Sequence, residues 1–286
     1  MTQLTRRNIL KGAGILGAAG ALGVSTATPA LAYNPYPSGG SGGTFNDANG
    51  LSYKDAQGIT SYYHLRAEHL AGKSGPFPLV IHLHGDGGYE YKNPNTWTAP
   101  LYGNVAKAIN GVYVIPRTPQ TGAGYTWWQS YSSTVWLKNL INHECRYYNI
   151  DRRRIFLSGY SGGAQAISYN LVADFNNLFQ GGGAMMLGGG GTSGMSITQT
   201  PSASCKENFL MRWHVGSDDD GSTSTDGFNA IAAAKVGYNT YTNAGWNTKP
   251  ITYYPGNDHY ESEDKGPAAL RSLVNESQVK YGLPTI

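Results

Sequence analysis

Short apolar segments alternate with segments of helical periodicity along most of the chain, and this alternation restricts the fold more than any other feature. A continuous apolar run suits a strand that is buried on both faces, as strands are in a parallel sheet. Strands that alternate with helices form such a sheet with helices on both of its faces. The sequence therefore predicts an α/β fold with a mostly parallel central sheet. The predicted strands are residues 78–83, 112–116, 155–157, 184–187, 210–215 and 251–254, and the predicted helices are residues 134–148, 164–173, 227–236 and 268–281.

Residues 1–32 have the layout of a removable export signal. Arg6 and Arg7 form a twin-arginine pair, an apolar stretch follows at residues 12–24, and Ala30-Leu31-Ala32 is a small-x-small cleavage site. This order is typical of precursors that use the twin-arginine export machinery. The apolar stretch is short and rich in glycine, which argues against a stable membrane anchor. We therefore expect a secreted protein, either extracellular or in the periplasm or cell wall.

The mature chain is expected to be electrically neutral. The whole chain has 21 basic and 18 acidic residues, and the predicted signal contains three of the basic residues and no acidic one, so 18 of each remain. A neutral protein lacks the basic surface with which proteins bind nucleic acid. Residues 33–44 are rich in Pro, Ser and Gly and predict a flexible lead-in. Residues 45–286 have an ordinary length for a single α/β catalytic domain.

The chain has two cysteines, Cys145 and Cys205. In an oxidising compartment, two cysteines most often form a disulfide. The sequence therefore predicts a Cys145–Cys205 disulfide, with two buried free thiols as the alternative.

The segment Gly159-Tyr160-Ser161-Gly162-Gly163 matches the nucleophile elbow, Gly-x-Ser-x-Gly. The serine of an elbow lies on a sharp turn from a strand to a helix, and glycine is needed on either side because larger side chains would collide. The same pattern surrounds Ser41, which has no predicted strand before it and no helix after it. Ser161 has both, as the motif requires. We therefore predict that Ser161 is the nucleophile.

A serine hydroxyl needs a base, and in this motif family the acid and the histidine follow the serine along the chain. His259 lies in the loop after the predicted strand 251–254 and is the predicted base. His214 lies within an apolar strand segment, which favours a histidine with a structural role. The acid is expected just after strand 210–215, where three aspartates are adjacent: Asp218, Asp219 and Asp220. Asp226 is a further alternative.

The loop after the first predicted strand is expected to form the oxyanion hole. It reads His84-Gly85-Asp86-Gly87-Gly88, and its glycines expose backbone N–H groups. The predicted donors are the N–H groups of Asp86 and Gly162, with Gly87 as the alternative to Asp86. No metal or cofactor is expected. A pair of metal ligands at His82 and His84, and a calcium loop at the three aspartates, are weaker alternatives because further ligands at the required spacing are missing.

From residue 78 to His259, the chain resembles secreted serine esterases of the feruloyl esterase and polyhydroxybutyrate depolymerase group. The similar features are residues 125–129, Tyr-Thr-Trp-Trp-Gln, the segment 149–155 that leads into the elbow strand, and the elbow itself. The resemblance implies an α/β-hydrolase fold and favours Asp219, since the group's pattern is Gly-x-x-Asp counted from Gly216. It also implies hydrolysis of carboxylic esters, such as feruloyl or acetyl esters of plant cell walls or polyesters.

Trp127 and Trp128 are candidate substrate-binding residues, because aromatic side chains suit the wall of an acyl or aryl pocket. Packing in the core below the active site is the alternative for this pair. Three alternatives to an esterase also remain. They are an acyltransferase similar to exported mycolyltransferases, a serine peptidase, and a secreted binding domain that has lost catalytic activity.

Overall fold

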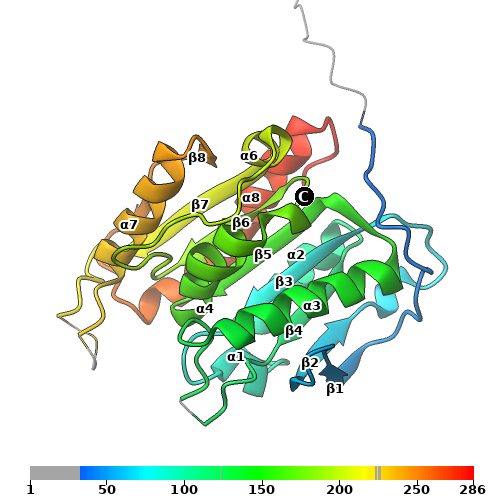
Figure 1. The fold of residues 1–286 in the computed structure, drawn as a ribbon, viewed down its shortest axis with the longest axis horizontal. Coiled ribbons are helices and arrows are strands. Elements are labelled where there is room, and N and C mark those ends of the chain that lie inside the picture. Colours follow the sequence, from blue (N-terminus) through cyan, green and yellow to red (C-terminus); the bar gives the residue numbers. More distant parts are fainter. Residues whose placement is uncertain (1–32, 123, 223, 225–226) are drawn as a thin grey trace, which may run out of the picture. The chain divides into compact units, whose positions relative to one another are not determined.

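The computed structural model describes residues 33–122, 124–222, 224 and 227–286. These residues form a nine-stranded sheet in the order β1-β2-β4-β3-β5-β6-β7-β8, and β9 also pairs with β7 (Figure 1). The pairings β3–β4, β3–β5, β5–β6 and β6–β7 are parallel, as are the pairings of β7 with β8 and β9. The predicted α/β class with a mostly parallel sheet is confirmed.

The central strands follow from the apolar segments. All side chains of β3 (Phe77–Leu83), β4 (Val112–Pro116) and β6 (Gly182–Leu187) are buried, as a sheet covered on both faces requires. β5 (Ile150–Tyr160) is longer than predicted, whereas β7 (Phe209–Gly216) and β9 (Thr252–Tyr254) lie where strands are expected. β8 (Asn247–Thr248) is a short strand at one edge that the sequence pattern missed.

Two further strands precede the one predicted as the first. β1 (Ala48–Lys54) and β2 (Thr60–Arg66) form an antiparallel hairpin, and β2 pairs antiparallel with β4. The prediction that residues 78–83 form the first strand is therefore wrong. These two strands are partly exposed, so polar side chains interrupt their apolar ones, and no continuous apolar run marks them.

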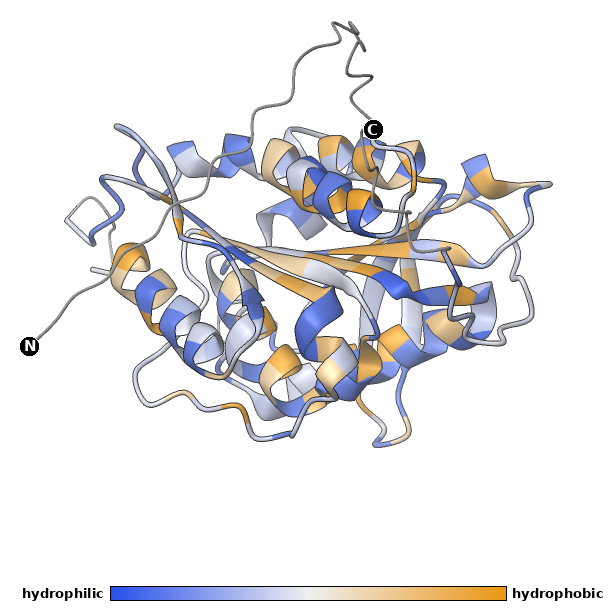
Figure 2. Ribbon diagram, turned by 90° about the horizontal axis from the view of Figure 1, so that it is seen from above, coloured by the Kyte–Doolittle hydropathy of each residue, from blue (hydrophilic) through white to orange (hydrophobic). Residues whose placement is uncertain are grey.

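Helices cover both faces of the sheet, as Figure 2 shows with the sheet seen between them. On one face, the first core cluster contains residues of α3 (Tyr131–Tyr148), α7 (Ala230–Asn243) and the helical segment after the elbow. That segment consists of α4 (Gly162–Gln165), a π-helical turn η2 (Ala166–Leu171) and α5 (Val172–Phe175). On the other face, α2 (Thr98–Ala108) and α8 (Gly266–Lys280) pack in the second cluster. The sheet is therefore buried between two helical layers.

Shorter helical turns connect these elements. They are η1 (Glu68–Leu70), α1 (Tyr89–Lys92), η3 (Asn176–Leu178), α6 (Ala203–Asn208) and η4 (Glu261–Lys265). Two of them matter for the site, because α1 follows the loop after β3 and η4 follows His259.

The segment predicted as a flexible lead-in contacts the domain. The N–H of Tyr36 donates to Asp151 Oδ1 at 3.0 Å, that of Ser38 to the carbonyl of Ile150 at 2.7 Å, and that of Ser41 to the carbonyl of Arg146 at 3.1 Å. These bonds attach residues 36–41 to the end of α3 and the start of β5, so this part of the segment 33–44 is held in place. The predicted export signal, residues 1–32, lies outside the described residues.

The predicted disulfide is wrong, because both cysteines are free thiols in the structure. Cys145 lies on α3, and Cys205 lies on α6, where its Sγ is 3.5 Å from the carbonyl oxygen of Asn176. Burial raises the pKa of Cys145 to about 11 and that of Cys205 to about 12. The alternative of two buried thiols therefore describes the structure.

Candidate active site

The predicted catalytic residues follow the carboxyl ends of three parallel strands, β5, β7 and β9. β3 pairs with β4 on one side and with β5 on the other, so the strand order reverses between β3 and β5. In open α/β sheets, ligands bind at such a switch point, outside the carboxyl ends of the strands. The loop after β3 and Ser161 at the end of β5 are therefore placed beside the same crevice.

Ser161 lies on the sharp turn that the elbow pattern predicts. Its backbone has φ 50° and ψ −114°, a conformation that costs energy for a residue with a side chain. A Cβ atom on Gly159 would lie 2.6 Å from the backbone of Gly163, and one on Gly163 would lie 2.4 Å from the carbonyl oxygen of Leu83. Both glycines are therefore required by close backbone packing, and the turn displays the Ser161 hydroxyl above the strand ends.

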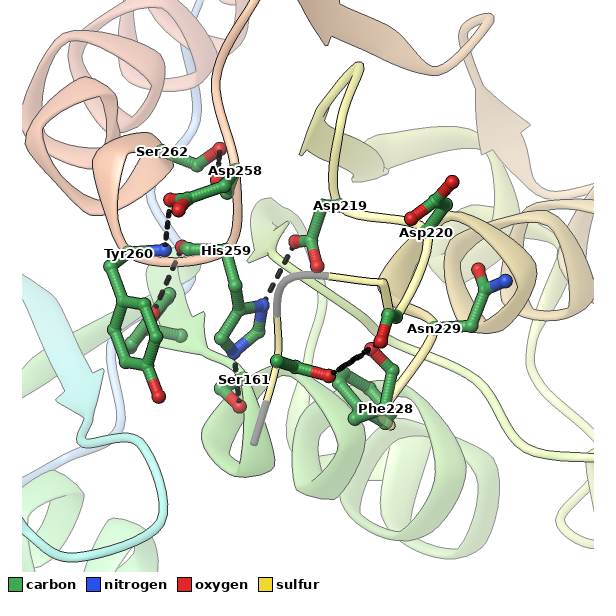
Figure 3. A network of polar contacts seen from close by, with 12 residues as sticks. Ser161, Asp219, Asp220, Phe228, Asn229, Asp258, His259, Tyr260 and Ser262 are labelled. Carbon is green, nitrogen blue, oxygen red and sulfur yellow. Dashed lines mark hydrogen bonds and ion pairs between the residues drawn. The ribbon is translucent and has the colours of Figure 1, made fainter. Parts of the chain in front are cut away.

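The structure brings together Ser161, His259 and Asp219, as Figure 3 shows. Ser161 Oγ lies 2.9 Å from His259 Nε2, and Asp219 Oδ2 lies 2.9 Å from His259 Nδ1. With the Nδ1 proton donated to the carboxylate, Nε2 accepts the hydrogen bond from the serine hydroxyl. Asp219 is only 1% exposed, so its charge is shielded little by water.

His259 is held in place by its neighbours. The hydroxyl of Tyr160 donates to the carbonyl oxygen of His259 at 3.0 Å, and the two rings lie 5.1 Å apart. The ring of Phe228 meets the imidazole edge-on at 5.7 Å. Burial raises the pKa of Tyr160 well above its ordinary value, so this hydroxyl keeps its proton and remains a donor. These contacts fix the orientation of the imidazole between the acid and the serine.

The structure separates the three adjacent aspartates. Asp218 and Asp220 are exposed, whereas Asp219 is buried. Asp218 accepts a hydrogen bond from the hydroxyl of Ser217, and Asp220 accepts one from the backbone N–H of Ser222. Asp219 is thus the one among these three that the structure pairs with His259. The remaining candidate, Asp226, lies outside the described residues.

The loop after β3 lies directly beside the elbow. A Cβ atom on Gly162 would lie 2.0 Å from Asp86 Oδ1, so the carboxylate of Asp86 rests against the backbone that follows the nucleophile. The alternative oxyanion donor, the N–H of Gly87, already donates to the carbonyl of Gly124 at 2.8 Å. Because the Gly87 N–H is engaged in this bond, we propose the N–H groups of Asp86 and Gly162 as the oxyanion donors.

The nucleophile opens into a cavity of about 190 Å³. The described residues that line it are Asp86, Trp128, Tyr160, Ser161, Gly162, Gln165, Ser224, Phe228, His259 and Tyr260. A larger cavity, about 440 Å³, lies at β2 and α2, but none of the predicted site residues lines it. The smaller cavity is therefore the candidate substrate site, because it contains the reacting groups.

The two candidate tryptophans have different positions. Trp127 is completely buried and packs against the ring of His84, so it belongs to the core and its predicted contact with substrate is wrong. Trp128 lines the cavity, and its Nε1–H donates to Asp86 Oδ2 at 3.2 Å. The carbonyl of Trp128 accepts a hydrogen bond from Asn170. Trp128 therefore remains a candidate substrate-binding residue.

The other histidines near these strands have structural contacts. His84 donates to the carbonyl of Gly85 and accepts from the N–H of Thr118, and burial lowers its pKa to about 4. His214 bonds to the hydroxyl of Tyr254, and burial lowers its pKa to about 4 as well. Within residues 33–122, 124–222 and 227–286, no cluster of three His, Cys, Asp or Glu side chains is placed to hold a metal ion.

Sequence reasoning missed several residues that shape the site. Tyr160 occupies the variable position of the elbow motif, and Phe228 and Ser224 follow the aspartates in a stretch without a motif. Gln165 Oε1 accepts from the N–H groups of Gly190 and Gly191 at 2.7 and 2.5 Å, which joins α4 to the loop after β6. Only Tyr160 could have been found from the sequence, by its place beside the nucleophile.

Part of the chain is similar in sequence to an enzyme of named activity. The chain is 34% identical over 138 residues to the bifunctional acetylxylan esterase/xylanase XynS20E of Neocallimastix patriciarum. The match covers 47% of this chain and 18% of the relative, so this chain corresponds to less than a fifth of the relative's length. No family model matches the chain.

Solved structures resemble this chain over most of its length. A thermostable esterase has a TM-score of 0.54 at 19% identity and covers 83% of this chain and 62% of its own. An α/β serine hydrolase without a lid, from Xanthomonas campestris, has a TM-score of 0.50 at 12% identity and covers 84% of this chain and 97% of its own. At this level of identity, the likeness concerns the fold.

Proposed function

We propose that this chain, which has the α/β-hydrolase fold, is a serine esterase that hydrolyses carboxylic esters through an acyl-enzyme. The observation that carries the proposal is the continuous series of hydrogen bonds from Asp219 through His259 to Ser161, with both distances at 2.9 Å. An activated serine beside backbone N–H donors is the arrangement that acyl transfer requires. The acetylxylan esterase activity in the name of the relative supports an ester rather than an amide as the substrate.

The proposed reaction proceeds in two halves. Ser161 Oγ attacks the ester carbonyl while His259 Nε2 takes its proton, and Asp219 stabilises the resulting imidazolium. The N–H groups of Asp86 and Gly162 bind the oxyanion, and the alcohol leaves with the proton from His259. Water then attacks the acyl-enzyme, again with His259 as the base, and releases the carboxylic acid. No metal or cofactor takes part in these steps.

The cavity favours a small, uncharged acyl group. Its volume of about 190 Å³ lies below the roughly 300–1,000 Å³ of pockets that enclose drug-sized ligands. An acetyl group needs little of this space, a feruloyl group would take up most of it, and a polyester segment would extend outside the cavity. The carboxylate of Asp86 at the wall would repel an anionic acyl chain and accept hydrogen bonds from hydroxyl groups. We therefore favour acetyl esters of a hydroxyl-rich polymer among the proposed feruloyl, acetyl and polyester substrates.

We further propose that the twin-arginine machinery exports the precursor. The sequence of Arg6-Arg7, the apolar stretch and the Ala30-Leu31-Ala32 site supports this route. Among the described residues, the structure has no helix with the length and hydropathy to cross a membrane. Replacing both arginines with lysine should leave the precursor in the cytoplasm. Processed protein outside the cells expressing this double variant would contradict the proposed route.

Ester hydrolysis by matched serine variants tests the proposed activity. A panel of p-nitrophenyl acetate, feruloyl esters, acetylated xylan and polyester films would be offered to the wild type, Ser161→Ala and Ser41→Ala. Ser41 has the same sequence pattern, but its hydroxyl bonds to the carbonyl of Tyr147 in the N-terminal segment. We expect Ser161→Ala to lose hydrolysis and labelling by a fluorophosphonate probe, and Ser41→Ala to keep both. Full activity in Ser161→Ala, or an unlabelled wild type, would reject a serine esterase.

A further inference from the structure

A buried carboxylate lies beneath the proposed oxyanion loop. Glu90 is in α1, the short helix that follows the loop, and it is only 2% exposed. Its Oε1 and Oε2 atoms lie 3.2 and 3.3 Å from the backbone N of Gly85, whose N–H donates to them. Glu90 does not line the cavity around Ser161, so it is not placed to touch a substrate there.

The same carboxylate is connected to the strand of the nucleophile. His82 Nε2 lies 3.5 Å from Glu90 Oε1, an ion-pair distance, and His82 Nδ1 lies 2.8 Å from Ser158 Oγ. Ser158 is in β5, three residues before Ser161. His82 and Ser158 are both completely buried, and the imidazole also stacks on the ring of Tyr102. One polar series therefore joins the oxyanion loop, β3 and β5.

The charge state of Glu90 distinguishes it from two other buried glutamates, Glu144 and Glu263. Burial alone would raise the pKa of Glu90, but the neighbouring imidazole of His82 leaves that pKa below its ordinary value. Burial raises the pKa of Glu263 to about 8, with a further increase from the charge of Glu90. Burial likewise raises the pKa of Glu144 to about 7. At neutral pH, Glu90 is therefore ionised in the interior. Its buried charge is stabilised by His82 and by the N–H of Gly85.

We propose that Glu90 and His82 are positioning residues that hold the Gly85–Asp86 peptide where the N–H of Asp86 can bind the oxyanion. An oxyanion donor is effective only if its position is set before the reaction begins. The bond from the Gly85 N–H fixes the peptide immediately before this donor, and the link to Ser158 fixes it relative to the strand of the nucleophile. This inference rests on the proposed esterase activity.

Two matched substitutions of buried carboxylates test the role. Glu90→Gln keeps the size of the side chain but removes the charge that pairs with His82. Glu144→Gln makes the same substitution on α3, where Glu144 is 1% exposed and does not line the active-site cavity. With p-nitrophenyl acetate, we expect kcat of Glu90→Gln to fall roughly tenfold to a hundredfold with KM within threefold, because a misplaced donor costs less than a missing one. Glu144→Gln should keep the wild-type kcat.

If Glu90→Gln does not fold, a second variant, Glu90→Asp, tests the same contact. Glu90→Asp keeps the charge but shortens the reach by one methylene group, so it should weaken the bond to Gly85 and lower kcat in the same way. The inference is overturned if the folded Glu90 variant keeps kcat within twofold of the wild type. It is also overturned if Glu144→Gln loses as much kcat as Glu90→Gln, since the loss would then reflect a general effect of disturbing the interior.

Amide hydrogen exchange separates this inference from the proposed activity. We expect the Gly85 amide to exchange at least about tenfold faster in the Glu90 variants than in the wild type, and at the wild-type rate in Glu144→Gln. Unchanged exchange at Gly85 in a folded Glu90 variant would reject the positioning contact. A wild type that neither hydrolyses esters nor reacts with a fluorophosphonate would instead reject the esterase, while exchange at Gly85 would still decide the contact.

Discussion

Substitution of Asp219 by asparagine should reduce turnover severely without disturbing the fold. The two side chains have nearly the same shape, so the change removes mainly the negative charge beside His259. With Asp219 Oδ2 at 2.9 Å from His259 Nδ1, the charges on the two groups are about 4 Å apart. At an effective dielectric constant near 20, opposite charges at that separation attract by about 4 kcal/mol. This attraction is gained when the imidazolium forms in the transition state, and its loss corresponds to roughly a thousandfold in rate.

The effect on the tautomer of His259 increases the expected loss. An asparagine that donates its N–H to Nδ1 would place the imidazole proton on Nε2, where the nitrogen could no longer accept from Ser161. In the best-studied triad, this substitution costs about ten-thousandfold in turnover. We therefore expect kcat of Asp219→Asn to fall by roughly a thousandfold to ten-thousandfold on p-nitrophenyl acetate, with the melting temperature near that of the wild type.

The neighbouring aspartates provide matched controls. Asp218→Asn and Asp220→Asn remove the same charge from exposed positions one residue away, where surface substitutions usually change stability by less than about 0.5 kcal/mol. Both variants should keep kcat within a few-fold of the wild type. If one of them is the crippled variant, the acid of the triad has been assigned to the wrong residue. If all three keep their activity, no aspartate of this turn supports His259.

Three further predictions concern charge, pH and thiols. Asp86→Asn should raise the rate on an anionic succinyl monoester relative to a neutral acetyl ester by about threefold to tenfold. The reason is that the repulsion between two nearby negative charges in water costs about 1 kcal/mol, and the substitution removes it. If the ratio of the two rates is the same in the variant and the wild type, the carboxylate does not lie at the acyl site. Burial raises the pKa of Glu144 from 4.5 to about 7, so the folded state keeps a proton that the unfolded chain loses, and stability should fall by about 3 kcal/mol as pH rises through that window. Glu263, whose pKa burial raises to about 8, adds a fall of the same sign, so urea unfolding should show a fall that is larger in the wild type than in Glu144→Gln by about 3 kcal/mol. A thiol titration of the denatured, unreduced protein should detect two free thiols, those of Cys145 and Cys205. If it detects none, the two cysteines form a disulfide.

The accuracy of the fold prediction depended on how completely each element is buried. β3, β4 and β6 are buried on both faces and therefore appear in the sequence as unbroken apolar runs. β1 and β2 lie toward an edge of the sheet, where exposed positions carry polar residues, and their pattern resembles that of a loop. The edge hairpin could not be predicted because its pairing with β4 is a contact between distant segments.

The accuracy of the site prediction depended on whether a residue's role is set by its local sequence. Ser161 is recognisable because the glycines that its turn requires are adjacent in the chain. The order of strands then limits the acid and the base to two loops, but it does not choose among Asp218, Asp219 and Asp220. That choice depends on the turn after β7, in which the N–H of Asp218 bonds to the carbonyl of Asn257 and the carbonyl of Asp219 bonds to the N–H of Ile231. Such bonds leave no signal in a single sequence.

The tryptophan pair shows the same limit for binding residues. Residues 127 and 128 are adjacent and chemically identical, yet Trp127 packs against His84 in the core while Trp128 lines the cavity with Asp86. From the sequence, both residues had the same two alternatives, whereas consecutive side chains leave the backbone in different directions and here have different surroundings. Which one does so is decided by the loop before α3 and by the bond from Asn170 to the Trp128 carbonyl. If Trp128 forms part of the acyl site, Trp128→Phe should alter KM across a series of acyl lengths, whereas Trp127→Phe should alter mainly the melting temperature. An equal change of KM in both variants would argue against this division of roles.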